Sequence, residues 1–156
     1  MITNENAVEK VEEITNHMIS ERNSNGFNSY DKFDVRKTFE DIFRGSGINY
    51  IYPRYLFEDD SDEMIFYVLH GKYISEVKRY SEANSISKHY IVDTYPLTVA
   101  GVSYQRQEKL ERQGVNLELK LENGKSFMFD SKEDSNQAWR DSFTNTIQEI
   151  YNHLIK

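Results

Sequence analysis

The densest group of potential ligands in this chain is an acidic run at residues 58–63, where five of six side chains are carboxylates. Calcium loops of the EF-hand type need acidic or amide residues at alternating positions, then Gly and a later Glu. Asp60 and Asp62 fit two of these positions, but Met64 breaks the third and no Gly follows. We therefore interpret the run as a solvated turn, and we predict no metal site and no cofactor.

Side chains that could act as bases or nucleophiles are present but lack catalytic spacing. His17, His70, His89 and His153 form no His-Glu-x-x-His or similar pattern. The segment at residues 45–47, Gly-Ser-Gly, lacks the outer glycine spacing of a nucleophile elbow and reads as a connector. Neither a Gly-x-Gly-x-x-Gly nor a Walker motif occurs. These patterns favour a protein that is not an enzyme.

Aromatic and basic side chains offer a candidate partner surface. Ten of the eleven tyrosines lie between Tyr30 and Tyr104, where they suit half-buried strands as well as binding surfaces. Two of them share a strand face with an arginine, and four basic residues follow within the only basic region. The candidate surface comprises Tyr50, Tyr52, Arg54, Lys72, Lys78, Arg79 and Lys88.

The totals limit the classes of function. A chain of 156 residues is long enough for one domain with a real core. A net charge of −7 disfavours nucleic-acid binding, which needs a positive surface. Cysteine is absent, which fits a reducing, cytoplasmic location. No run of 18 apolar residues and no signal peptide are apparent, so we predict a soluble protein.

Two helices are predicted before a change of period near residue 45. Apolar residues at three- and four-residue steps mark a first helix over residues 6–22 and a second, shorter helix that includes Val35 and Phe39. Asp34 is a plausible cap of the second helix, and Gly45 a plausible terminator. The apolar stripe of the first helix can pack on the rest of the chain or pair with its symmetry mate in a dimer.

Seven short strands are predicted after this point, joined by short turns, which indicates an antiparallel sheet. Pro53 pushes the first of them toward a sheet edge or a bulge. The polar segment at residues 107–114 is predicted to be a loop. The expected strands are 48–57, 64–69, 72–80, 86–95, 97–106, 115–121 and 127–129.

The end of the chain gives the clearest pattern. Asn123-Gly124 favours a two-residue hairpin turn between the last two strands. Asp130 or Ser131 can then cap a long amphipathic helix in which Trp139 belongs to the apolar stripe. We expect Trp139 to be buried with the rest of this stripe.

Seven strands followed by one C-terminal helix resemble the pleckstrin-homology-like fold. The residues that carry the resemblance are Trp139, the turn Asn123-Gly124 and the flanking strands 117–121 and 127–129. The resemblance implies an α+β protein in which residues 1–45 form a helical segment. Residues 46–156 would then form a seven-stranded antiparallel barrel or sandwich capped by the last helix. Lipid-binding members place Lys and Arg around the first hairpin loop. Here that loop is the acidic run 58–63, so lipid binding is not carried over.

Three functional hypotheses follow. The first is a non-catalytic interaction module that binds a protein partner. The second is a ligand-binding protein or small enzyme with a pocket between helices and sheet. The third is a peripheral binder of anionic membranes through the segment from Lys72 to Lys88.

Overall fold

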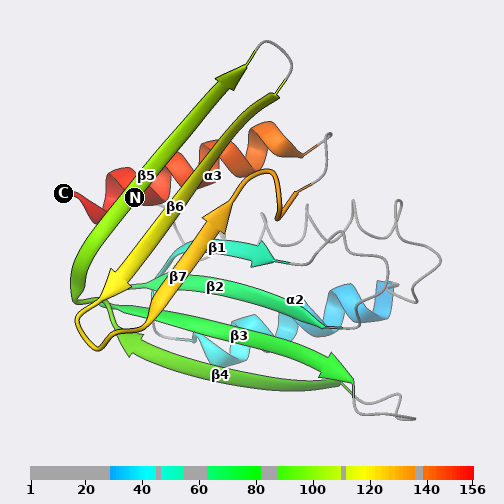
Figure 1. Cartoon of the computed structure of the whole chain (residues 1–156). Coiled ribbons are helices and arrows are strands. Elements are labelled where there is room, and N and C mark those ends of the chain that lie inside the picture. Colours follow the sequence, from blue (N-terminus) through cyan, green and yellow to red (C-terminus); the bar gives the residue numbers. More distant parts are fainter. Residues whose placement is uncertain (1–28, 45–46, 55–62, 82–87, 110–111, 136–138) are drawn as a thin grey trace. The chain divides into compact units, whose positions relative to one another are not determined.

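A computed structural model describes residues 29–44, 47–54, 63–81, 88–109, 112–135 and 139–156 (Figure 1). The described residues fall into two compact units, one ending at Tyr95 and the other beginning at Pro96. The first unit contains α2 (Ser29–Ile42), β1 (Ile48–Arg54), β2 (Met64–His70), β3 (Tyr73–Ser81) and β4 (Lys88–Pro96). The second contains β5 (Val99–Lys109), β6 (Arg112–Leu121), β7 (Ser126–Asp130) and α3 (Arg140–Leu154). Within the described residues, no helix is long and apolar enough to cross a membrane.

The first unit is a four-stranded sheet in the order β1-β2-β3-β4, with α2 on one face (Figure 1). Gly71 begins the tight turn between β2 and β3 with a φ of 59°, a backbone conformation that glycine adopts without steric cost. Asn49 supports this turn by accepting a hydrogen bond from the Gly71 amide at 3.1 Å. The turn fixes the register in which Phe66 lies opposite Val77 and Val68 opposite Ser75.

Alternation along the strands decides which side chains meet α2. Successive strand residues point to opposite faces, so Phe66 and Val68 share one face of β2 while Tyr67 and Leu69 share the other. Phe39 of α2 packs edge-on against Phe66, with ring centroids 5.0 Å apart. We call the α2 side of the sheet the inner face and the opposite side the outer face. The inner-face core comprises Val35, Phe39, Phe43, Ile48, Ile51, Met64, Phe66, Val68 and Val77.

The second unit is a three-stranded antiparallel sheet in the order β5-β6-β7 with α3 against it. Its buried side chains come from alternate positions of β6 and β7 and from one stripe of α3, as their periods require. Tyr104 of β5 stacks on Tyr151 near the end of α3, with ring centroids 4.7 Å apart. The buried apolar set is Val115, Leu117, Leu119, Leu121, Phe127, Phe129, Phe143, Ile147 and Ile150.

The prediction of an α+β protein with seven antiparallel strands and a C-terminal helix is confirmed in outline. The predicted barrel is not closed, because the described strands hydrogen-bond as separate sheets of four and three strands. Pro96 ends β4 and has no amide hydrogen with which to extend the ladder. The predicted first helix, residues 6–22, lies outside the described residues, so α2 is the one N-terminal helix that the structure describes.

Several predicted boundaries are wrong. Residues 107–109 and 112–114, expected in a loop, extend β5 and β6 and pair with each other. The connection at Asn123-Gly124 spans residues 122–125 rather than two residues, with the φ of Gly124 at 92°. The Asn123 side chain accepts a hydrogen bond from the Lys125 amide at 2.9 Å and so closes a local turn of its own.

Trp139 occupies the position just before α3, not its interior, and it is half-buried rather than buried. The residues expected to begin that helix form turns instead. Asp130 accepts hydrogen bonds from the amides of Lys132 and Glu133 at 2.9 and 3.2 Å, and Asp134 accepts one from the Asp130 amide at 3.0 Å. Short polar side chains that bond nearby amides in this way compete with helix formation.

Candidate functional site

A partly buried polar cluster ties the first half of α2 to the sheet. Arg79 of β3 is only 2% exposed, and its Nε donates a hydrogen bond to the Tyr90 hydroxyl at 3.1 Å. Tyr90 of β4 donates in turn to Asp34 Oδ2 at 2.7 Å, and this oxygen lies 3.7 Å from Arg79 Nη2. Burial and the hydrogen bond to Asp34 raise the pKa of Tyr90 to about 12, so the hydroxyl remains a donor at neutral pH. Asp34 therefore anchors α2 from inside the helix and is not its cap.

A second polar cluster lies toward the other end of α2. His70 Nε2 and Ser75 Oγ are 2.7 Å apart, and Ser75 Oγ lies 2.8 Å from Thr94 Oγ1. The Phe43 ring packs on the imidazole, with centroids 5.0 Å apart, and Tyr73 stacks on it at 5.9 Å. Burial lowers the pKa of His70, so the neutral ring is favoured.

Ser75 and His70 are the residue types of a nucleophile and its general base, but they are not accessible to a substrate. Ser75 is completely buried, so its hydroxyl presents no surface to a substrate. His70 Nδ1 is buried without a hydrogen-bond partner, whereas a catalytic histidine is oriented through this second nitrogen. The arrangement fits a structural hydrogen-bond chain that links β2, β3 and β4.

No metal centre is assembled in the part of the chain that the structure describes, since no three His, Asp or Glu side chains gather there. Most of the acidic run 58–63 lies outside the described residues. Glu63 is the one residue of this run that the structure describes. Its carboxylate lies 3.5 Å from Nζ of Lys78, a residue of β3.

The outer face can be built row by row from the strand register. Across β1, β2 and β3, one row contains Tyr52, Tyr67 and Glu76, and the next contains Arg54, Ile65 and Lys78. Three side-chain contacts between β3 and β4 extend these rows, because all three fit the same antiparallel register. They are Tyr80 with His89, Arg79 with Tyr90, and Ser75 with Thr94. The same register places Asp93 beside Glu76 and Ile91 beside Lys78.

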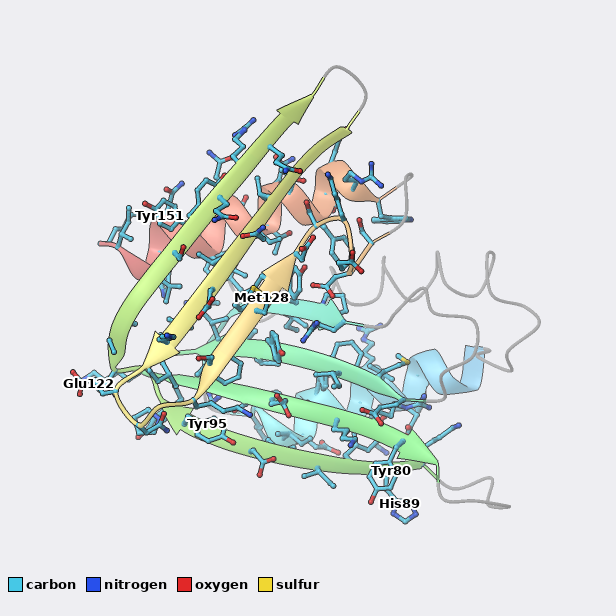
Figure 2. All side chains as sticks on the ribbon, viewed as in Figure 1. Tyr80, His89, Tyr95, Glu122, Met128 and Tyr151 are labelled. Atoms are coloured by element: carbon cyan, nitrogen blue, oxygen red, sulfur yellow. The ribbon has the colours of Figure 1, made fainter. Side chains whose placement is uncertain are left out.

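Exposure on this face is low on β1 and β2 and higher on β4. Tyr52 and Leu69 are fully buried and Tyr67 is 4% exposed, whereas Ile91 is 44% exposed. Figure 2 shows Tyr80 and His89 side by side where β3 ends and β4 begins, with ring centroids 5.4 Å apart. We call this group the β4 surface; it comprises Lys78, Tyr80, His89, Ile91 and Asp93.

The structure separates the predicted partner residues. Tyr50, Tyr52 and Arg54 share the outer face as expected, but Tyr52 is buried and Arg54 Nη1 donates to the Tyr67 hydroxyl at 2.9 Å. Lys78 also lies on this face.

Three other basic residues lie elsewhere. Arg79 is a buried inner-face residue, so its assignment to a surface is wrong. Lys88 alternates with His89 and therefore follows the inner-face register, and Lys72 is exposed in the turn after Gly71. The basic residues consequently do not form one patch.

The β4 surface was missed because its members are of mixed type. His89, Ile91 and Asp93 occupy alternate positions of one strand, but they include an aromatic, an apolar and an acidic residue, so no period in hydropathy marks the face. The alternation of strand residues could have identified this face, since alternate residues of any strand point to the same side of the sheet. No family model matches the chain, and no curated protein or solved structure matches it.

Proposed function

We propose that the chain is a non-catalytic interaction module that binds a protein partner through the β4 surface. The observation that carries the proposal is Ile91, a large apolar side chain that is 44% exposed on a strand. It lies beside the stacked pair Tyr80 and His89 and is flanked by the charged groups of Lys78 and Asp93. An apolar and aromatic centre with a charged rim is the usual anatomy of a protein-binding surface.

The rigidity of the strands beneath this surface supports the same proposal. Arg79 and Tyr90 face inward directly behind Tyr80 and Ile91, and their hydrogen bond joins β3 to β4. A surface held by a buried polar contact loses little conformational entropy on binding, which favours affinity. The net charge of −7 further favours a protein partner over a nucleic acid.

We further propose that the chain belongs to the pleckstrin-homology-like folds. The support is the order of seven antiparallel strands followed by α3. An experimental structure that closes the two sheets around one core would agree with this assignment, whereas one that pairs β4 with β5 in a single flat sheet would contradict it.

The binding proposal is tested by comparing three immobilised baits in an extract of the source cells. The baits are the wild-type chain, the double variant Lys78→Ser/Tyr80→Ser and the control Met128→Ser. Met128 is 41% exposed but lies on β7 in the second unit (Figure 2). We expect a protein that both the wild type and the control retain and the double variant loses, and its purified form should bind with the same order of affinities.

Circular dichroism must first show that the three baits are equally folded. If all three baits retain the same proteins, the β4 surface is not the binding site. If no bait retains a specific protein at micromolar concentration, the interaction module itself is refuted.

A further inference from the structure

The side of β4 that faces away from β3 has no strand paired to it among the described residues. β4 is the last strand of its sheet and, among the described strands, pairs only with β3. Edge strands are usually protected from pairing by Lys, Pro or a bulge. In β4, Lys88 and Pro96 occupy the two ends, so the central segment 90–94 has neither residue.

We propose that this edge pairs antiparallel with β4 of a second copy of the chain, around a two-fold axis at Ile91. The two four-stranded sheets would then form one continuous sheet, with both β4 surfaces on the same side. The inference does not depend on the proposed partner protein, because self-association can be measured with the chain alone.

The side chains of β4 select this register. With the axis at Ile91, the two exposed Ile91 side chains meet, and His89 of each copy lies opposite Asp93 of the other. An imidazole N–H can donate to a carboxylate, and a protonated ring adds charge attraction. An axis at Val92 would place Ile91 against Asp93, and an axis at Asp93 would oppose two carboxylates. A two-fold interface must be self-complementary, and of these registers only the one centred on Ile91 satisfies this condition.

The charges on the outer face also favour a second copy of the chain as the partner of β4. The β3–β4 register places Asp93 beside Glu76, and two carboxylates in neighbouring positions repel each other. Asp93 is exposed and has no ion-pair partner among the described residues. His89 of the second copy would lie on the open side of Asp93 and offset this repulsion. On the inner-face register, Tyr90 would lie opposite Val92, an aromatic and β-branched pair that sheets favour.

Sedimentation velocity with charge-exchange variants tests the register. We expect the wild type to approach twice its chain mass of 18.5 kDa as concentration rises. His89→Asp or Asp93→Lys should raise the dissociation constant about tenfold, because each change acts twice across the axis. The double variant His89→Asp/Asp93→Lys restores opposite charges and should recover the dimer. Glu122→Lys is the control for added positive charge, since Glu122 is exposed in the second unit (Figure 2).

Cysteine cross-linking gives an independent test, because the chain has no cysteine of its own. Paired residues of antiparallel strands have Cα atoms about 4.5–5.5 Å apart, a separation that a disulfide can bridge. Ile91→Cys should therefore form a disulfide-linked dimer under mild oxidation. Asp93→Cys should not, because its two copies would be about 13 Å or more apart along the strands.

An equimolar mixture of His89→Cys and Asp93→Cys should cross-link. A monomer at all concentrations, a dimer that the charge variants leave unchanged, or equal cross-linking at positions 91 and 93 would each overturn the proposal. Where a variant fails to fold, as judged by circular dichroism, the remaining cysteine and charge variants decide the question.

Discussion

The substitution Asp34→Asn tests whether the partly buried cluster of Arg79, Tyr90 and Asp34 holds α2 on the sheet. The change keeps the size of the side chain and an oxygen that can still accept the hydrogen bond from Tyr90. It removes the negative charge that lies 3.7 Å from Arg79 Nη2. Arg79 is 2% exposed and would remain positively charged in a buried position.

The expected cost follows from the distance and the exposure. Two unit charges 3.7 Å apart interact by about 4.5 kcal/mol at an effective dielectric constant of about 20. The Asp34 side chain is 33% exposed, so water screens part of this interaction. We therefore expect the free energy of unfolding to fall by about 2 kcal/mol, below the 3–5 kcal/mol loss typical of a fully buried pair.

Asp41→Asn is the matched control, because it makes the same chemical change on the same helix. Its partner Arg44 lies 3.2 Å away, but both side chains are exposed, so the expected loss is at most about 1 kcal/mol. Urea unfolding followed by far-ultraviolet circular dichroism gives both values. The reasoning fails if the two variants lose the same stability. It also fails if Arg79→Met, which removes the buried charge, does not recover part of the loss in the Asp34→Asn background.

Three further outcomes are expected from the structure. Because burial lowers the pKa of His70 below 6.5, the unfolded chain binds the proton more tightly, so stability should decline as the pH falls through 6.5. Subtracting the profile of His70→Gln isolates this contribution, and identical profiles would contradict it. Gly124→Ala should lower the free energy of unfolding by about 1 kcal/mol, because the φ of Gly124 is positive. Gly101→Ala is the control in the same urea assay and should cost less, because its Cβ would meet no atom within 4 Å. Trp139→Ala should cost less than Phe143→Ala, for which about 3–5 kcal/mol is expected, since the tryptophan is half-buried and Phe143 is 2% exposed; equal losses would show that Trp139 is a core residue.

Strand positions were predictable from the sequence wherever one face is buried and the other wet. Leu117, Leu119 and Leu121 alternate with Asn116 and Glu118, and the structure buries the three leucines. The reason is that a period of two leaves one consistent way to place the apolar set. Boundaries were less predictable, because a polar segment such as residues 107–109 can extend a hairpin through backbone pairing that its hydropathy does not reveal.

The roles of charged residues depended on long-range contacts and were not predictable from local pattern. Aspartate is a residue type that often caps a helix, so Asp34 was predicted to be a cap. Its hydrogen-bond partner is instead Tyr90, which lies 56 residues further along the chain. Arg79 was grouped with Lys78 because both belong to the basic region of the sequence. Consecutive strand residues point to opposite faces, so these two could not share a surface, and the alternation rule alone already separates them.

The two polar clusters of the first unit explain why α2 has one position on the sheet. Val35, Phe39 and Phe43 recur every four residues, so a shift of one helical turn, about 5.4 Å, would present a similar apolar stripe to the same core. Such a shift would carry Asp34 away from Arg79 and leave a buried charge without this partner. It would also move Phe43 off the His70 ring. We infer that apolar burial attaches α2 while Asp34 selects its register. Asp34→Asn should then accelerate hydrogen exchange in α2 more than in β2, because the helix is freed to slide before the sheet opens.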